Sequence, residues 1–159
     1  MGNITVFTGS GHGKSPAAIG EALMRAAAGD NVVIIQFLKG KGVTDSDLIN
    51  RLEPELKIFR FEKSEENFDD LPKDKQEEEI LNIRNGINFA RKVISTGGCE
   101  LLVLDELLGI IDNGIVSTEE VKELLTMAPE HMDVILTGIR PDEEILNLSS
   151  AVSEIIKKK

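Results

Sequence analysis

The 159-residue sequence predicts a single α/β domain with a mostly parallel central sheet. Short apolar or β-branched runs of strand length alternate with longer stretches in which apolar residues recur every three or four positions. Strands joined by helices of this length form parallel sheets with right-handed crossovers. The chain is long enough for one such core and too short for two, and it shows no internal repeat or linker. We therefore expect residues 1–159 to form one domain.

The first half of the chain contributes three expected strands and one long helix. Ile4–Phe7 is the first expected strand, and Lys14–Ala28 shows the apolar spacing of a helix that Gly29 ends. Val32–Ile35 is a continuous β-branched run, which predicts a strand buried on both faces, as in parallel sheets. Leu56–Phe61 is the third expected strand.

The second half begins with an acidic segment, Glu62–Glu79, which has nine Asp or Glu residues and only Phe68 and Leu71 as apolar side chains. We expect a mobile surface loop there that leads into a helix. Ser117 and Glu120 form the pattern of a capping box at the start of another helix. The remaining expected elements are a helix through Ile80 and Ile94 that ends at Gly97, strands over Leu101–Leu104, Val134–Leu136 and Ala151–Ile155, and a short helix over Pro141–Leu148.

The glycine-rich segment between the first strand and the first helix has the arrangement of a phosphate-binding P-loop. Its backbone N–H groups and the helix N-terminus would face phosphate oxygens, and glycine permits the positive φ angles that this requires. Lys14 supplies a charge for the terminal phosphates, and the Ser15 hydroxyl is a Mg²⁺ ligand. The residues assigned to nucleotide binding in this segment are Thr8, Gly9, Ser10, Gly11, His12, Gly13, Lys14 and Ser15.

This loop departs from the strict P-loop pattern at Thr8, where glycine is usual. The alternative interpretation is a flexible turn before an ordinary helix, but Gly-Lys-Ser at a strand–helix junction favours nucleotide binding. Together with the alternating elements, it predicts a three-layer, P-loop NTPase-like (RecA-like) fold.

Asp105 and Glu106 follow an apolar strand, which is the pattern of a Walker B site. We expect Asp105, together with Ser15, to hold Mg²⁺, and Glu106 to polarise a water or substrate group or to help bind the metal. The alternative is a solvated acidic strand end. The functional interpretation is favoured because ligands bind at the carboxyl ends of strands in such sheets.

A third cluster, Thr137-Gly138-Ile139-Arg140-Pro141, again follows a strand. Thr137 and Gly138 are expected to lie beside the P-loop and to contact the nucleotide, while Arg140 reaches phosphates. A strand end followed by a proline-started helix explains this segment equally well.

Composition limits the classes of partner. The net charge of −10 and the absence of Trp and Tyr argue against nucleic acid, because phosphate contacts need clustered cations and bases stack on aromatic side chains. The single cysteine, Cys99, excludes an internal disulfide and fits a reducing compartment; we expect it to be at least half-buried. Since the longest apolar runs have only strand length, no signal peptide or membrane span is expected, and a cytoplasmic location is predicted.

Four segments together resemble the P-loop family of ATP:cob(I)alamin (corrinoid) adenosyltransferases. They occur in that family's order and spacing and are Thr8–Ser15, Val33–Gly40, Leu102–Leu107 and Val134–Gly138. Threonine at the first loop position is itself typical of the family. The run Gln36-Phe37-Leu38-Lys39-Gly40 is the most distinctive element, because generic P-loop ATPases lack it. The resemblance extends from Ile4 to about Glu154.

The resemblance implies transfer of the 5′-deoxyadenosyl group from ATP to the cobalt of a reduced corrinoid, cobalamin or another, with release of tripolyphosphate. Family members bind ATP reversed relative to ordinary P-loop ATPases, which exposes C5′ to cobalt. It also implies catalytic roles for Lys14, Asp105 and Glu106, and a homodimer. Arg140 is expected to act in place of the family's arginine, and an electron-donating reductase is a candidate partner. Neither nucleic acid nor a membrane is expected as a partner.

By the same resemblance, Gln36, Phe37 and Lys39 are expected to shape the nucleotide or corrinoid pocket. The segment around Phe59, Phe61 and Phe68 is the candidate cover for the corrinoid, although Phe59 and Phe61 fit an ordinary core as well.

Two positions depart from the family pattern. Pro16 stands where the family has threonine, and Ile139 stands where it has arginine, with Arg140 one position later. Two other functions therefore stay open from the sequence. One is a P-loop ATPase or phosphotransferase, and the other is a nucleotide- or corrinoid-binding protein with little catalysis.

Overall fold

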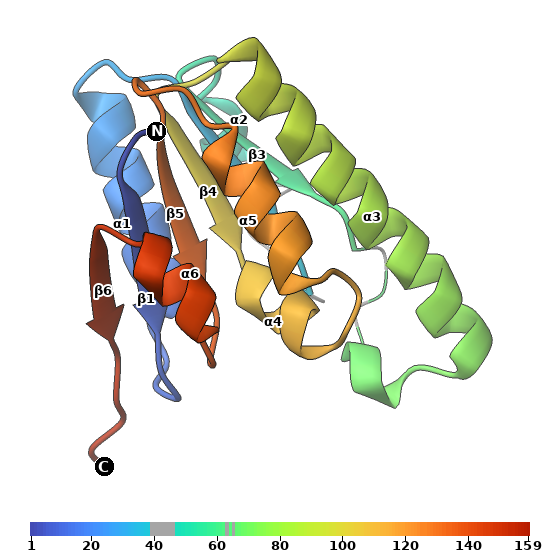
Figure 1. Cartoon of the computed structure of the whole chain (residues 1–159). Coiled ribbons are helices and arrows are strands. Elements are labelled where there is room, and N and C mark those ends of the chain that lie inside the picture. The colour runs from blue at the N-terminus through green and yellow to red at the C-terminus, as the bar shows by residue number, and fades with distance from the viewer. Residues whose placement is uncertain (39–46, 63, 65) are drawn as a thin grey trace.

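The described part of the chain, residues 1–38, 47–62, 64 and 66–159 of a computed structural model, is built on a six-stranded, all-parallel sheet (Figure 1). The strand order is β3-β2-β4-β5-β1-β6. Because all strands are parallel, their carboxyl ends meet at one edge of the sheet. The predicted α/β class with a parallel sheet is confirmed.

All six predicted strands form, and their bounds agree with the prediction to within one residue at each end. Continuous apolar runs explain this accuracy for β2, β4 and β5, because these central strands are buried on both faces. The strands are β1 Ile4–Thr8, β2 Val32–Gln36, β3 Leu56–Arg60, β4 Leu101–Asp105, β5 Asp133–Thr137 and β6 Ala151–Glu154.

The long helices also agree with the prediction. Ser117 caps its helix by accepting a hydrogen bond from the Glu120 N–H at 3.1 Å, and Gly97 ends another in the left-handed conformation. The helices are α1 Lys14–Ala27, α2 Asp47–Asn50, α3 Lys73–Thr96, α4 Leu107–Asp112, α5 Thr118–Thr126 and α6 Glu143–Leu148, with a 3₁₀ turn, η1, over Phe68–Asp70.

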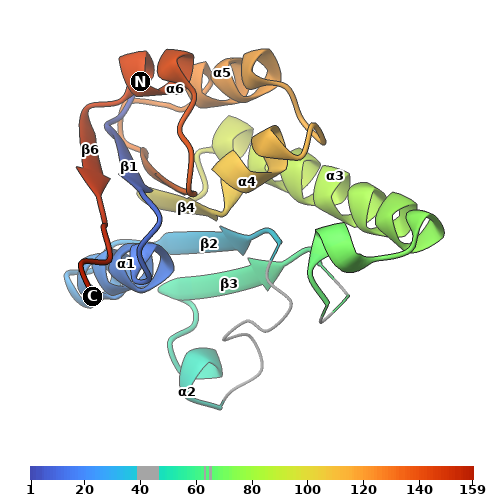
Figure 2. The same ribbon diagram turned by 90° about the horizontal axis from the view of Figure 1, so that it is seen from below.

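The helices differ from the prediction in several places. The acidic segment is not all loop, because α3 already begins at Lys73, and its first turns project beyond the sheet, where no apolar face is needed (Figure 2). The six-residue helix α4 was not expected at all. Helix α6 begins two residues later than Pro141, at Glu143, because the Asp142 side chain caps it by accepting from the Glu144 N–H at 2.8 Å.

The sheet is the middle of three layers (Figure 2). Helix α1 covers one face, where Ala18 and Ala22 pack on Val32 and Ile34. Helices α3 to α6 cover the other face over a larger core, which receives the alternate residues of the same strands and also contains Cys99, buried as expected. The three-layer arrangement predicted from the sequence is confirmed.

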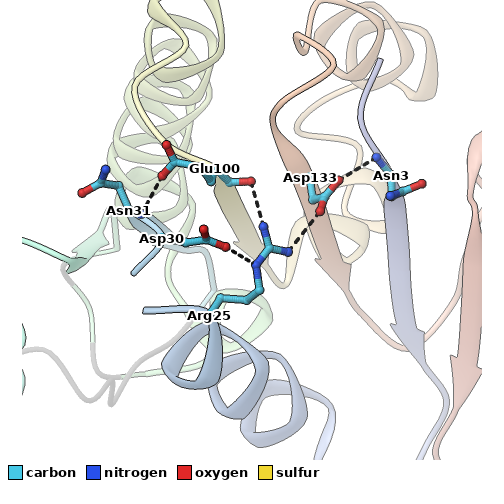
Figure 3. Close-up of polar contacts among 6 residues, drawn as sticks. All are labelled: Asn3, Arg25, Asp30, Asn31, Glu100 and Asp133. Atoms are coloured by element: carbon cyan, nitrogen blue, oxygen red, sulfur yellow. Dashed lines mark hydrogen bonds and ion pairs between the residues drawn. The ribbon is translucent and has the colours of Figure 1, made fainter. Parts of the chain in front are cut away.

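A polar cluster holds the end of α1 that is remote from the glycine-rich loop (Figure 3). Arg25 pairs with Asp30 and donates to Asp133 Oδ2 at 3.0 Å and to the Glu100 carbonyl at 3.5 Å. Asp133 in turn accepts from the Asn3 N–H at 2.9 Å. The hydrogen bond with Asp30 is the main reason why the pKa of Arg25 lies above its ordinary value. The cluster fixes α1 against the amino ends of β4 and β5, and so fixes the direction of the loop at its other end.

Glu62 and Glu79 are both about 5% exposed, although the sequence placed them in a mobile surface loop. Glu79 Oε1 accepts a hydrogen bond from the Ser64 N–H at 3.2 Å. Burial, and to a lesser degree the charge of Glu79, raise the pKa of Glu62 to about 7 against the opposing effect of Arg60. Glu62 follows the end of β3 by two residues, on the side of the sheet where the carboxyl ends of the strands meet.

The buried Glu62 predicts a pH dependence of stability. Its pKa rises from 4.5 in the unfolded chain to about 7 in the folded one, so the folded state favours the protonated form. Its contribution is therefore fully present below pH 4.5 and is lost as the pH rises through about 7. We expect the melting temperature of Glu62→Gln, measured by calorimetry between pH 5 and 8, to exceed that of the parent by roughly 2–6 °C at the upper end and to match it at the lower end. Equal pH profiles for Glu62→Gln and for the exposed control Glu66→Gln would contradict this role.

Candidate functional site

The glycine-rich loop connects β1 to α1 at the carboxyl edge of the sheet. Gly9 and Gly13 have φ angles of +110° and +114°, which side-chain-bearing residues rarely adopt. A Cβ on Gly9 would stand 2.3 Å from the Ile155 carbonyl oxygen, and that same oxygen accepts a hydrogen bond from the Gly11 N–H at 2.9 Å. The chain that follows β6 therefore contacts and supports the loop. The sequence did not suggest this contact, because the hydrogen bond uses only the Ile155 backbone.

A cavity of about 370 Å³ opens over this loop. The amino end of α1 faces it, which gives a helix N-terminus and loop amides suited to phosphate oxygens. Lys14 Nζ donates to the Gly11 carbonyl at 2.9 Å, so the ammonium group lies across the loop. The cavity is lined by Ser10, Gly11, His12, Gly13, Lys14, Ser15, Pro16, Glu106 and Ile139.

Asp105 lies beneath the cavity at the end of β4 and is fully buried. Its Oδ1 accepts hydrogen bonds from the Ser15 hydroxyl and from the Thr137 hydroxyl, each at 2.7 Å. Its Oδ2 accepts from Gln36 Nε2 at 3.2 Å. The structure thus brings together the two residues that the sequence predicts as metal ligands, Ser15 and Asp105.

These two residues fit Mg²⁺. A hydroxyl and a carboxylate are the hard oxygen donors that this ion prefers, and Mg²⁺ in nucleotide sites takes one or two protein ligands while water and phosphate oxygens complete its shell. The Ser15 hydroxyl donates a hydrogen bond to Asp105, so the lone pairs of the Ser15 oxygen point away from the carboxylate.

Glu106 takes the position after Asp105 and lines the cavity. Its φ angle is +65°, a left-handed conformation that is uncommon outside glycine and asparagine and that concentrates at functional sites. Its N–H donates to the Thr137 hydroxyl at 2.8 Å. Its Oε2 lies near Gly109, 3.1 Å from the point where a Cβ would stand, so the carboxylate lies over the first turn of α4.

The third cluster lies beside the loop, as predicted. The Ile139 carbonyl accepts from the Thr8 hydroxyl at 3.0 Å and from the Gly9 N–H at 3.4 Å, and the Gly138 N–H donates to the Phe7 carbonyl at 3.2 Å. Ile139 itself forms part of the cavity wall, a role that the sequence did not suggest. Arg140 is exposed and does not line the cavity.

Not every predicted site residue reaches the cavity. Six predicted residues are buried and do not line it: Thr8, Gly9, Gln36, Asp105, Thr137 and Gly138. Gln36 and Thr137 are joined to Asp105 by hydrogen bonds. Lys39 lies outside the described residues. The residues that the structure brings to the cavity surface are Ser10, Gly11, His12, Gly13, Lys14, Ser15 and Glu106.

The phenylalanines near β3 pack against α3. The ring centroids of Phe59 and Phe61 lie 4.7 and 5.6 Å from that of Phe89. Phe61 and Phe68 are half-buried against the larger core. The core role considered for Phe61 is therefore confirmed, while coverage of a corrinoid by this segment stays a prediction.

In the described residues, no helix combines the length and apolar character needed to cross a membrane.

Known proteins are similar in sequence to this chain over nearly all of its length. Residues 1–159 match the family model described as ATP:corrinoid adenosyltransferase BtuR/CobO/CobP. The corrinoid adenosyltransferases of Escherichia coli K12 and Salmonella typhimurium are each 30% identical to it over 154 residues, which cover 97% of this chain and 76% of theirs. That of Pseudomonas aeruginosa is 25% identical over 97% of this chain and 74% of its own. With its P-loop cavity above the Ser15–Asp105 pair, the chain belongs to the ATP:corrinoid adenosyltransferase family, enzymes that transfer the adenosyl group of ATP to a corrinoid.

Proposed function

We propose that the cavity over the glycine-rich loop binds Mg-ATP with its triphosphate on the loop and its C5′ atom turned toward a reduced corrinoid. The cobalt(I) electron pair attacks C5′, a cobalt–carbon bond forms, and the C5′–O bond breaks. The bonding electrons leave with the triphosphate oxygen, and cobalt becomes formally cobalt(III). The observation that supports this most directly is the Ser15–Asp105 hydrogen bond at 2.7 Å beside a loop-lined cavity.

The protein has no nucleophile to supply in this reaction, so its residues act by positioning and by charge. The loop amides and Lys14 hold the triphosphate and take up the charge that develops on it as the leaving group. Ser15 and Asp105 hold Mg²⁺, which neutralises the phosphates when bound. The remaining residues proposed to contact or shape the nucleotide site are Thr8, Gly9, Ser10, Gly11, His12, Gly13, Gln36, Lys39, Thr137 and Gly138.

Glu106 completes the proposed catalytic set from the opposite wall. Glu106 lines the same cavity as Lys14, which supports a role for its carboxylate in accepting a hydrogen bond from a nucleotide hydroxyl or in sharing the metal's water shell. A single-domain, cytoplasmic homodimer that receives electrons from a reductase is part of the same proposal.

The activity is tested by adding Mg-ATP and chemically reduced cobalamin to the protein under anaerobic conditions. We expect the absorption spectrum of an adenosylated corrinoid, which reverts on exposure to light because the cobalt–carbon bond is photolabile. A spectrum that stays that of the unalkylated corrinoid, in a protein that still binds Mg-ATP, would contradict adenosyl transfer and favour a binding role.

Arg140 is proposed to stabilise charge on the leaving triphosphate in place of the family's arginine. It follows Ile139, which already lines the cavity and cannot supply a charge. We expect Arg140→Ala to lower turnover with reduced corrinoid by roughly ten- to a thousand-fold, the scale of losing one charge-stabilising donor.

Steady-state kinetics of Arg140→Ala, Arg140→Lys and the exposed control Arg51→Ala check this role. Lysine keeps the charge without the planar fork, so partial recovery is expected, and Arg51→Ala should match the parent. Turnover of Arg140→Ala equal to that of the parent would remove Arg140 from the proposed site.

A further inference from the structure

Thr137 stands at the end of β5, fully buried, next to the end of β4. Its hydroxyl donates to Asp105 Oδ1 at 2.7 Å and accepts from the Glu106 N–H at 2.8 Å. One hydroxyl group thus joins two consecutive residues, one beneath the cavity and one on its wall. Thr137 does not line the cavity, and its hydroxyl is already engaged with Asp105 and Glu106, so a direct contact with the nucleotide does not describe this position.

The bond to Asp105 restricts how its carboxylate is oriented. Oδ1 is shared by the Thr137 and Ser15 hydroxyls, and Gln36 holds Oδ2 from the other side. Because β4 lies between β2 and β5, donors from both neighbouring strands fix the plane of the carboxylate. The Ser15 hydroxyl donates to the same oxygen, so the plane of the carboxylate also sets the orientation of this hydroxyl.

The bond to Glu106 restricts the backbone where β4 ends. Glu106 holds a left-handed φ of +65°, a strained conformation for a residue with a side chain. Such a conformation persists only where surrounding contacts determine it, and the hydrogen bond to Thr137 is one of them. This turn sends the Glu106 side chain into the cavity while Asp105 stays below it.

We propose that Thr137 is a positioning residue that sets Asp105 for the metal and Glu106 for the cavity at the same time. Its single hydroxyl group fixes the Asp105 carboxylate and the Glu106 backbone relative to β5. The inference rests on the proposed function, because that function gives Mg²⁺ its role. Thr137 acts through Asp105 and Glu106 and does not contact ATP itself.

Thr137→Val tests this inference, because it keeps the shape and removes both hydrogen bonds. We expect the affinity for ATP in the presence of Mg²⁺, measured by calorimetry, to fall roughly ten- to a hundred-fold, the equivalent of leaving a buried polar group without its partner. The affinity for ATP without Mg²⁺ should change less than threefold. Amide hydrogen exchange at Glu106, followed by NMR without any ligand, should accelerate because its N–H loses its acceptor. Thr137→Ser keeps the hydroxyl and should restore both measurements.

Thr118→Val is the matched control. The Thr118 hydroxyl donates to Asp142 Oδ2 at 3.0 Å, which is the same kind of hydroxyl–carboxylate bond in the covering layer of helices. Its loss should lower the melting temperature without a Mg²⁺-specific change in ATP affinity. If Thr137→Val does not fold, Thr137→Ala repeats the test with a smaller side chain, again against Thr137→Ser.

The possible outcomes are separable. A Mg²⁺-specific loss in Thr137→Val that Thr137→Ser reverses supports the inference. Equal losses with and without Mg²⁺, a failure of serine to restore binding, or unchanged exchange at Glu106 would each overturn it. Adenosylation of cobalamin by the parent is measured in parallel. A parent without turnover refutes the proposed function, whereas the calorimetric and exchange results still decide the role of Thr137.

Discussion

Lys14→Ala is expected to lose most of its Mg-ATP binding while the chain stays folded. The Lys14 side chain is half-buried, lies across the loop on the Gly11 carbonyl, and lines the cavity, so it contributes little to the core and much to the charge of the site. A charge-assisted hydrogen bond contributes about 1.5–3 kcal/mol, which corresponds to a loss of roughly ten- to a hundred-fold from one contact. Calorimetric titration with Mg-ATP measures this loss of affinity directly.

The control for Lys14→Ala is Lys92→Ala, which removes an exposed lysine from α3. Both variants change the net charge equally, so a difference between them belongs to the loop. Circular dichroism melts of the two variants should stay close to that of the parent. Tight binding of Mg-ATP by Lys14→Ala would show that the loop is not the phosphate site.

Asp105→Asn is expected to weaken Mg²⁺-dependent ATP binding much more than Mg²⁺-independent binding. A carboxylate beside the metal acts through its charge, and asparagine removes that charge with almost no change of shape. We expect a loss of roughly ten- to a thousand-fold with Mg²⁺, because metal ligation and charge neutralisation fail together.

The surroundings of Asp105 allow this variant to fold. An asparagine amide would place N–H groups opposite Gln36 Nε2 or opposite the two hydroxyls. Gln36 Oε1 is buried without a hydrogen-bond partner among the described residues, so a flip of the Gln36 amide provides an acceptor. Calorimetry with and without Mg²⁺ separates the two effects. Equal losses in both conditions would indicate that Asp105 has only a structural role at the strand end.

The fold was predictable where the pattern of apolar residues carries the information. The Val32–Ile35 run and the alternation of buried positions define strands whatever their neighbours are. The start of α3 was not predictable in this way, because its first turns, from Lys73, project beyond the sheet and carry charged residues like a loop. Helix α4 was missed because a six-residue apolar helix is too short to show a helical period.

The site was predictable to the extent that it depends on local sequence. The proposed phosphate site from Thr8 to Ser15 uses the loop's own backbone, and Asp105 follows its own strand, so spacing along the chain identifies both. The burial of Gln36 and Thr137 beneath the cavity depends on strand order, since β2 and β5 flank β4 only in the folded sheet. The sequence therefore indicated that Gln36 and Thr137 belong to the site and gave no sign that their side chains bind Asp105.

In the proposed reaction, ATP is cleaved at C5′ and its three phosphates leave as one unit. Phosphorus NMR identifies the products after the protein is incubated with Mg-ATP and chemically reduced cobalamin. We expect tripolyphosphate in an amount equal to the adenosylated corrinoid formed, and none when cobalamin stays oxidised. ADP and inorganic phosphate as the products, formed whether or not reduced cobalamin is present, would contradict it and identify a P-loop ATPase instead.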